Sequence, residues 1–496
     1  MKPRVEDSRF DFRGGLNTAL SPDDLNANEL VLATNARLAT TRGAVAKRTG
    51  TKRLHPTTLA SGADITALIQ WDAPAAKQVV AIAGGNLYHK TSAFGEFTEV
   101  VPGVVFSSTE RQAMAVMRAA TEGAPLVLYI GDSTGLRSWD GTSLVVIDGT
   151  DNTPPADLLA VYHLRLFARD PDFPKHLFWS KTGDPEYFTT GASTDGGSAI
   201  ADILSGESLQ ALEVVGSSLL FASEDAVGRF TGYSTDDIEL AQDTEGITSE
   251  VGAVGPLALK RVENAAALLS DKGPYYVNES QAVPIGEKVE PEFDGLDRSV
   301  LENSAIGWHR GRREIWYAVP GSSDSAVNKT VYVFAARLGS WSGPWTYSFG
   351  ITCLARYEDS NGDEWLLSGG DDGFVRHMDI GSLDDVLSDG TGGSAYTMTV
   401  EFAPAFFDNA GVIKALDRLQ VEADIVSGEL PTLQLAFDDA SFTSYTLTGV
   451  GNDVQHYRVD AQDQQGYRLR VRYVDATTDI SLLHGLRLGA YRYERP

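Results

Sequence analysis

The sequence repeats one local pattern along its middle: an apolar strand, a turn of small and acidic residues, and a second strand that carries an aromatic side chain. Short apolar runs separated by Gly, Asp, Asn and Ser predict β-hairpins. A repeated hairpin constrains the fold, because each small sheet can bury its faces only against a neighbouring copy. Five stretches align in this way: "VVAIAGGNLYHK" from Val79, "LVLYIGDSTGLRSW" from Leu126, "SLLFASEDAVGRF" from Ser218, "AALLSDKGPYYV" from Ala266 and "EWLLSGGDDGFVR" from Glu364.

The spacing of this repeat predicts a β-propeller. The aromatic residues of the second strands recur about every 48 residues, and a blade of WD40 and kelch-type propellers takes roughly 40 to 50 residues. We therefore expect an all-β chain with an irregular propeller of about six or seven blades over residues 61–385. The aromatic markers are Tyr88, Trp139, Trp179, Phe230, Tyr276, Trp316 and Phe374.

The pattern changes on both sides of the repeat. Residues 377–398 are rich in Asp, Gly and Ser, which marks a domain boundary. Beyond it, residues 386–496 alternate polar and apolar side chains at period two, as in "KALDRLQVEADIV" and "YRLRVRYVD". This alternation predicts a C-terminal antiparallel β-sandwich. Residues 1–60 are expected to form a separate N-terminal arm or platform.

Negative charge is concentrated in the middle of the chain. Residues 1–55 contain 10 Lys and Arg against 6 Asp and Glu, whereas residues 56–390 contain 22 against 48. A body of this sign repels nucleic acid, which argues against a DNA-binding protein but suits a wall along which DNA slides without sticking. Solubility alone is the other explanation of the charge.

The sequence also bears on location. No apolar run reaches the length of a membrane span, so we expect no membrane insertion. The start "MKPRVEDSRFDFRGG" lacks the apolar stretch of a secretory signal. We expect a soluble protein that is made inside a cell.

Catalytic and metal-binding motifs are weak throughout, and we predict that the protein is not an enzyme, with no catalytic, cofactor-binding or metal-binding residues. Cys353 is the only cysteine, and the eight histidines have no metal-ligand spacing. The stretch Gly131–Gly135 fits G-x-S-x-G, but a strand follows Ser133 where a nucleophile elbow requires a helix. The hairpin alignment places Ser133 in the same turn as Asp225, Asp271 and Asp371, which explains the match.

The N-terminal region carries an ordered series of short motifs. This order resembles the N-terminal region of bacteriophage tail structural proteins, in particular the nozzle, tail tubular, hub and stabilisation proteins of short-tailed phages. The resemblance in letters covers about the first 55 residues. The motifs are "FRGGLNT" from Phe12, "SPDDL" from Ser21, "NEL" from Asn28, "NAR" from Asn35 and "KRTG" from Lys47.

The resemblance implies a virion structural protein, made in the host cytoplasm, that assembles into a ring of identical subunits, usually six. Such a ring lies below the portal and adaptor proteins, contacts tail fibre, needle or tip proteins, and continues the DNA channel. It helps to retain the genome and releases it at infection without specific DNA binding. Residues Phe12 to Asn17 would then pack on neighbouring subunits. The alternative for these residues is a strand that completes the chain's own sandwich or propeller.

Two other functions remain open on the sequence. A β-propeller is also suited to a receptor- or glycan-binding component of a tail tip or fibre, with exposed aromatic residues on one face. A propeller hydrolase is the second, and it would depend on Ser133 or on one carboxylate.

Overall fold

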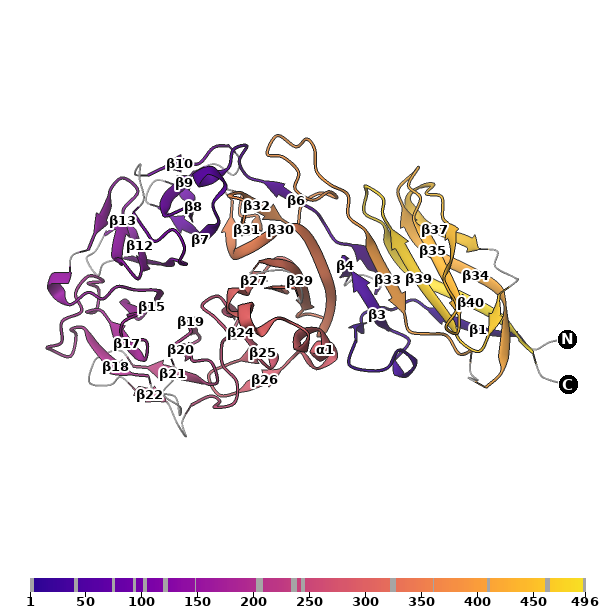
Figure 1. Cartoon of the computed structure of the whole chain (residues 1–496), viewed down its shortest axis with the longest axis horizontal. Helices are drawn as coiled ribbons and strands as arrows, with labels where there is room; N and C mark the ends of the chain where they lie inside the picture. The colour runs from indigo at the N-terminus through magenta and orange to yellow at the C-terminus, as the bar shows by residue number, and fades with distance from the viewer. Residues whose placement is uncertain are drawn as a thin grey trace.

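The structure is a computed structural model, and two β-rich parts lie side by side in it (Figure 1). On one side the repeated hairpins form a ring of blades, and on the other two sheets pack into a sandwich. The chain is therefore all-β, a propeller with a sandwich, as expected. The structure describes residues 4–39, 43–73, 76–91, 95–100, 105–118, 124–147, 149–201, 208–232, 239–241, 246–321, 327–359, 361–407, 411–459 and 464–493.

Within these residues the propeller has seven blades of four antiparallel strands. In each blade the first strand lies at the centre of the ring, next to the first strands of the neighbouring blades. Blades 1 to 3 comprise β7 (Ile65–Asp72), β8 (Lys77–Ala83), β9 (Asn86–Lys90) and β10 (Thr98–Glu99); β11 (Ala113–Arg118), β12 (Leu126–Asp132), β13 (Gly135–Trp139) and β14 (Leu144–Val146); and β15 (Leu158–Tyr162), β16 (Arg165–Arg169), β17 (His176–Trp179) and β18 (Gly197–Ile200).

Blades 6 and 7 share one long strand. The 19 residues of β30 (Ser340–Glu358) form the outer strand of blade 6 with their first half and the inner strand of blade 7 with their second half. Blades 4 to 7 comprise β19 (Ala211–Val215), β20 (Ser218–Ala222), β21 (Val227–Thr231) and β22 (Glu239–Ala241); β23 (Leu259–Val262), β24 (Ala265–Ser270), β25 (Gly273–Val277) and β26 (Ala282–Pro284); β27 (Ala305–His309), β28 (Glu314–Val319), β29 (Asn328–Ala335) and β30; and β30, β31 (Glu364–Gly370), β32 (Val375–Met378) and β6 (Thr51–Arg53).

Six of the seven aromatic markers lie in the third strand of a blade or directly before it, as the alignment of hairpins predicts. Trp316 is the exception, because it lies in β28, the second strand of blade 6. The third strand there, β29, contains Tyr332 instead. The assignment of Trp316 was wrong because blade 6 has apolar residues on both middle strands, and period and composition do not distinguish them.

The sandwich consists of two sheets whose strands alternate buried and half-buried residues, the pattern that the sequence showed. One sheet contains β1 (Arg4–Arg9), β4 (Ala36–Leu38), β5 (Val45–Lys47), β34 (Ile413–Ile425), β37 (Gly451–Val459), β38 (Gln465–Gly466) and β40 (Leu482–Tyr493). The other contains β2 (Gly15–Leu16), β3 (Glu29–Thr34), β33 (Met398–Phe402), β35 (Thr432–Phe437), β36 (Thr443–Thr446) and β39 (Leu469–Asp475).

The expected separate N-terminal unit over residues 1–60 is not what the structure shows. Strand β1 pairs along β40 from Arg4 opposite Tyr491 to Arg9 opposite Leu486, so the first and last described strands are neighbours. Strand β3 pairs with β33, and β5 pairs with β40. The N-terminal segment is therefore an integral part of the sandwich, which is one of the two alternatives that the sequence left open.

Strand β6, further along the N-terminal segment, closes the propeller. It pairs antiparallel with β32, with Thr51 opposite Met378 and Arg53 opposite Arg376. Blade 7 thus takes its fourth strand from the segment that precedes blade 1, and this pairing closes the ring of blades. The described residues contain one α-helix, α1 (Glu290–Asp294), with short 3-10 turns elsewhere. None of the described helices is long and apolar enough to cross a membrane.

His55 secures this closure just beyond β6. Its side chain is fully buried, and its Nε2 accepts a hydrogen bond of 2.9 Å from the backbone N–H of Val375. Nδ1 therefore carries the proton and donates to the carbonyl of Thr57. Burial lowers the pKa of His55 to about 4 from the ordinary 6.5.

We expect His55 to make the stability of the protein depend on pH. In the unfolded chain His55 binds a proton below pH 6.5, whereas in the folded chain it stays neutral down to about pH 4. Unfolding therefore takes up a proton, and the folded state loses roughly 3 kcal/mol as pH falls from 6.5 to 4. Urea denaturation across this range should show this loss, and His55→Gln should reduce the slope. His456→Gln, on an exposed residue, is the control, and an unchanged slope in His55→Gln would contradict the assignment.

Candidate functional site

The residues of the N-terminal motifs lie where the propeller and the sandwich meet. Only Arg48, Thr49 and Gly50 separate β5 of the sandwich from β6 of blade 7. The chain returns to the sandwich through residues 379–397, between β32 and β33. The two crossings run side by side, and backbone hydrogen bonds join Gly50 to Gly381 and Thr51 to Leu383. We call the contacts that join the motif residues to these crossings, to one another and to the propeller the junction.

Arg48 is the centre of the junction. Its guanidinium is fully buried and forms an ion pair with Asp384, with 2.8 Å from Nη1 to Oδ1. Nη2 also donates to the carbonyl of Thr346 at 2.8 Å. The guanidinium lies 3.8 Å from the ring centre of Tyr396 and 4.2 Å from that of Tyr347. One side chain therefore contacts the outgoing crossing, the returning crossing and strand β30.

The "NAR" motif forms the next layer. Asn35 has a positive φ of 50°, and its Oδ1 accepts hydrogen bonds of 2.9 Å from Arg48 Nε and from the backbone N–H of Thr346. Arg37 is buried between two carboxylates, Glu314 of blade 6 at 3.1 Å and Asp379 of the returning crossing. Although burial opposes the charge, these two carboxylates raise the pKa of Arg37. Both side chains thus attach the sandwich to the propeller.

The "FRGGLNT" and "NEL" motifs meet at Glu29. Its carboxylate, 3% exposed, accepts hydrogen bonds from Asn17 at 3.0 Å and from the side chain of Asn26 at 2.9 Å. Lys288, from the connection between blades 5 and 6, lies 2.8 Å from Glu29 Oε1. Burial works against ionisation, but the bonds from Lys288, Asn26 and Asn17 lower the pKa of Glu29 to about 2. Glu29 is therefore charged at neutral pH and links two motifs to the propeller.

The glycine pair of the first motif is required by close backbone contacts. A Cβ on Gly14 would lie 2.6 Å from the carbonyl oxygen of Asn28. Gly15 has a φ of +71°, and a Cβ there would lie 2.6 Å from the carbonyl oxygen of Trp341. Side chains at these two positions would separate the N-terminal segment from β3 and from β30.

The expectation that residues Phe12 to Asn17 pack on neighbouring subunits is wrong for the buried residues of this stretch. Phe12 and Leu16 are fully buried within their own chain, and the ring of Phe12 lies 5.1 Å from that of Phe402. They belong to one apolar cluster that continues from the sandwich into blades 4 to 6 and includes Trp341. This shared core makes the two parts one packed body.

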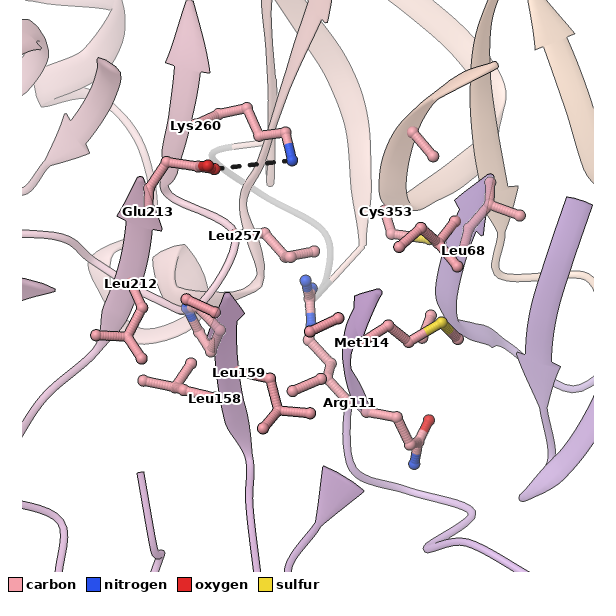
Figure 2. Close-up of a pocket in the computed structure, with 18 of the residues that line it drawn as sticks. Leu68, Arg111, Met114, Leu158, Leu159, Leu212, Glu213, Leu257, Lys260 and Cys353 are labelled. Atoms are coloured by element: carbon pink, nitrogen blue, oxygen red, sulfur yellow. Dashed lines mark ion pairs between the residues drawn. The ribbon is translucent and has the colours of Figure 1, made fainter. Parts of the chain in front are cut away.

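A second candidate site is the channel at the centre of the propeller. Inner strands of all seven blades line a cavity of about 520 Å³. Figure 2 shows apolar side chains from different blades around it, and the guanidinium of Arg111 projects into its middle. At one end, Glu213 and Lys260 form an ion pair of 3.8 Å. The apolar side chains labelled there are Leu68, Met114, Leu158, Leu159, Leu212 and Leu257.

One face of the propeller is acidic. Because every blade has four antiparallel strands, the turns between second and third strands lie on the face that also carries the connections between blades. Contacts agree with this, since Arg298 lies 3.5 Å from Asp271 and Ser133 donates to Glu110 at 2.6 Å. Burial and the nearby carboxylate of Asp371 raise the pKa of Asp64. The exposed carboxylates of this acidic face include Asp64, Glu110, Glu224, Asp225, Glu250 and Glu302.

The candidate catalytic residues lie in ordinary structural positions. Ser133 is in the turn between β12 and β13, the place that its alignment with Asp225, Asp271 and Asp371 predicts. Its hydroxyl donates to Glu110, and no histidine of the described chain forms a hydrogen bond with it. Cys353 is a buried free thiol whose pKa is raised by burial. The described residues contain no group of three or more His, Cys, Asp and Glu placed to bind a metal ion.

No family model and no curated protein matches the sequence. Solved structures of β-propeller proteins are similar to it in fold. One, from the mitotic checkpoint complex, has a TM-score of 0.43 at 11% identity and covers 72% of this chain and 97% of its own. The N-terminal domain of Nup159 gives 0.38 at 10% identity, with 70% and 98% covered. PorZ, a surface component of the type IX secretion system of Porphyromonas gingivalis, gives 0.42 at 12% identity, with 80% and 55% covered.

Replacement of Arg48 tests how much the junction contributes to stability. Arg48→Met leaves Asp384 buried without its cation, and we expect a loss of about 3 to 5 kcal/mol in the free energy of unfolding. The double variant Arg48→Met with Asp384→Leu should recover part of this loss, because it removes the uncompensated charge as well. Arg13→Met is the matched control, since Arg13 pairs with Asp11 at an exposed position. Urea denaturation measures the free energy of unfolding of each variant. If Arg48→Met and Arg13→Met lower it by the same amount, the proposed contribution of the junction to stability is contradicted.

Proposed function

We propose that this protein is a virion structural protein, a nozzle or hub subunit of a bacteriophage tail. In this proposal identical subunits form a ring, six in number, that continues the DNA channel below the portal and adaptor. The ring helps to retain the genome and releases it at infection. The subunits are made in the host cytoplasm and join tail fibre, needle or tip proteins in the particle.

The observation that supports the proposal best is the position of the motif residues. The residues of the motifs that resemble tail structural proteins are also the residues of the junction. Gly14 and Gly15 make its close backbone contacts, and Glu29 binds Lys288 of the propeller. Arg37 and Arg48 form its buried ion pairs. A motif that fixes two domains to each other has a structural role. It fits a subunit that must transmit force between the parts of an assembly without bending.

The acidic face gives the proposal its second part. Exposed carboxylates gather at the loops of one propeller face, and like charges repel the phosphates of DNA. We propose that this face borders the DNA path, where it prevents the genome from adhering. The proposal needs no base-specific contact and no cationic groove.

The ring is tested first by native mass spectrometry and negative-stain images of the purified protein, alone and mixed with the portal and adaptor of the same particle. We expect a closed ring with a central hole. Arg48→Met should reduce ring formation because the two domains are no longer fixed to each other, whereas Arg313→Met, which breaks an exposed ion pair with Glu263, should assemble normally. A protein that stays monomeric in every mixture contradicts the proposal, and host-cell binding by that monomer would support the tail-tip alternative.

The role of the acidic face is tested by the rate of DNA release. Particles with Glu110→Lys, Glu224→Lys and Glu250→Lys should release DNA more slowly than the wild type, and the difference should grow at low salt, where charges are screened less. The same three residues changed to Gln should have a smaller effect. Glu99→Lys, on the outer strand of blade 1, is the control. Release at the wild-type rate from the Lys variants would contradict the proposed position of this face.

A further inference from the structure

Arg111 spans the propeller channel from one side to the other. It lies just before β11 of blade 2, and its Nη2 donates a hydrogen bond of 2.7 Å to the carbonyl oxygen of Asn303, just before β27 of blade 6. Asn328 of blade 6 donates to the same oxygen at 2.6 Å, which fixes its position. The guanidinium is thus held in the cavity, beside the connection between blades 5 and 6 that lies on the acidic face.

The other terminal nitrogen of Arg111 has no partner among the described residues. Nη1 is buried and forms no hydrogen bond with them. No ion pair joins Arg111 to a described carboxylate, although Glu302 and Asp64 are near enough to favour its charge. Burial lowers the pKa of Arg111, but an arginine keeps its proton in proteins. A buried cation with an unused donor is costly unless an anion meets it.

The rest of the cavity has the size and the walls of a ligand site. Its volume of about 520 Å³ lies within the range of roughly 300 to 1,000 Å³ that is usual for small-molecule pockets. Leu68, Met114 and Leu159 provide apolar walls from three different blades, and Leu257 adds another from the connection that precedes blade 5 (Figure 2). A few polar groups in an apolar pocket orient a ligand. Among the described residues that line this cavity, the buried polar side-chain atom without a hydrogen-bond partner is Nη1 of Arg111.

We propose that the propeller channel binds a small amphiphile with one carboxylate, whose oxygens accept a hydrogen bond from Arg111 Nη1. The apolar body of the ligand lies against Leu68, Met114 and Leu159. The ion pair of Glu213 with Lys260 bounds the far end of the site. This site is independent of the proposed function in the tail, because it is built within a single subunit.

Calorimetric titration of the purified protein with three probes of the same chain length tests the site. Decanoate carries the carboxylate, decan-1-ol has no charge, and decyltrimethylammonium has the opposite charge; all are used below the concentration at which they form micelles. We expect decanoate to bind at least tenfold more tightly than the other two. Equal binding of the three probes, or binding of none, would overturn the proposal.

Substitutions assign the binding to Arg111. Arg111→Met should weaken decanoate binding about tenfold to a hundredfold, the usual effect of a lost hydrogen bond to a charged group. Arg298→Met removes an exposed arginine from the same face and should change the affinity less than twofold. Leu159→Trp fills the cavity, keeps Arg111 and should abolish binding, so it tests the site even if Arg111→Met does not fold. Wild-type affinity in either Arg111→Met or Leu159→Trp would overturn the proposal.

Discussion

The burial of two arginines between domains is the constraint on which the rest of the structure depends. Arg48 lies where the chain leaves the sandwich and Arg37 lies in β4, and each forms an ion pair with a carboxylate of the returning segment. Buried ion pairs of this kind add little net stability compared with apolar packing, but they are costly to break. They therefore fix the relative position of the two crossings, and with it the pairing of β6 in blade 7 and of β5 in the sandwich.

The local sequence patterns predicted the blades but not the pairing of strands that are distant in the chain. The hairpin repeat is contained in about 48 residues, so its turns, six of its seven aromatic markers and the turn position of Ser133 could be read from the sequence. The partner of β1 lies at the other end of the chain, in β40. Alternation at period two shows that β1 and β40 are half-buried strands, but it does not show which strand each one joins. The N-terminal segment therefore resembled a separate arm.

The same limit explains what could be foreseen of the candidate sites. The N-terminal motifs marked the residues of the junction, because Gly14, Gly15, Asn35 and Arg48 stand in the ordered series of motifs that the sequence analysis singled out. Nothing marked Arg111, a single arginine in a polar connection between blades. Its place becomes visible only when blades 2 and 6 face each other across the channel. The acidic face could be predicted in part. The hairpin alignment placed Asp225, Asp271 and Asp371 in the equivalent turn of different hairpins, but it did not show that the connections between blades lie on the same face.

The topology also determines the order in which the parts can become complete. Blades 1 to 6 contain only strands that follow one another along the chain, so each can form locally. Blade 7 and both sheets of the sandwich need strands from the N-terminal segment as well as later strands. To form contacts between residues so far apart in the chain, a long loop must first be closed, and the entropy lost in closing it precedes any stabilisation from the contacts. The junction belongs to this late group, because Arg48 can form its ion pair only with Asp384 of the segment that returns after blade 7.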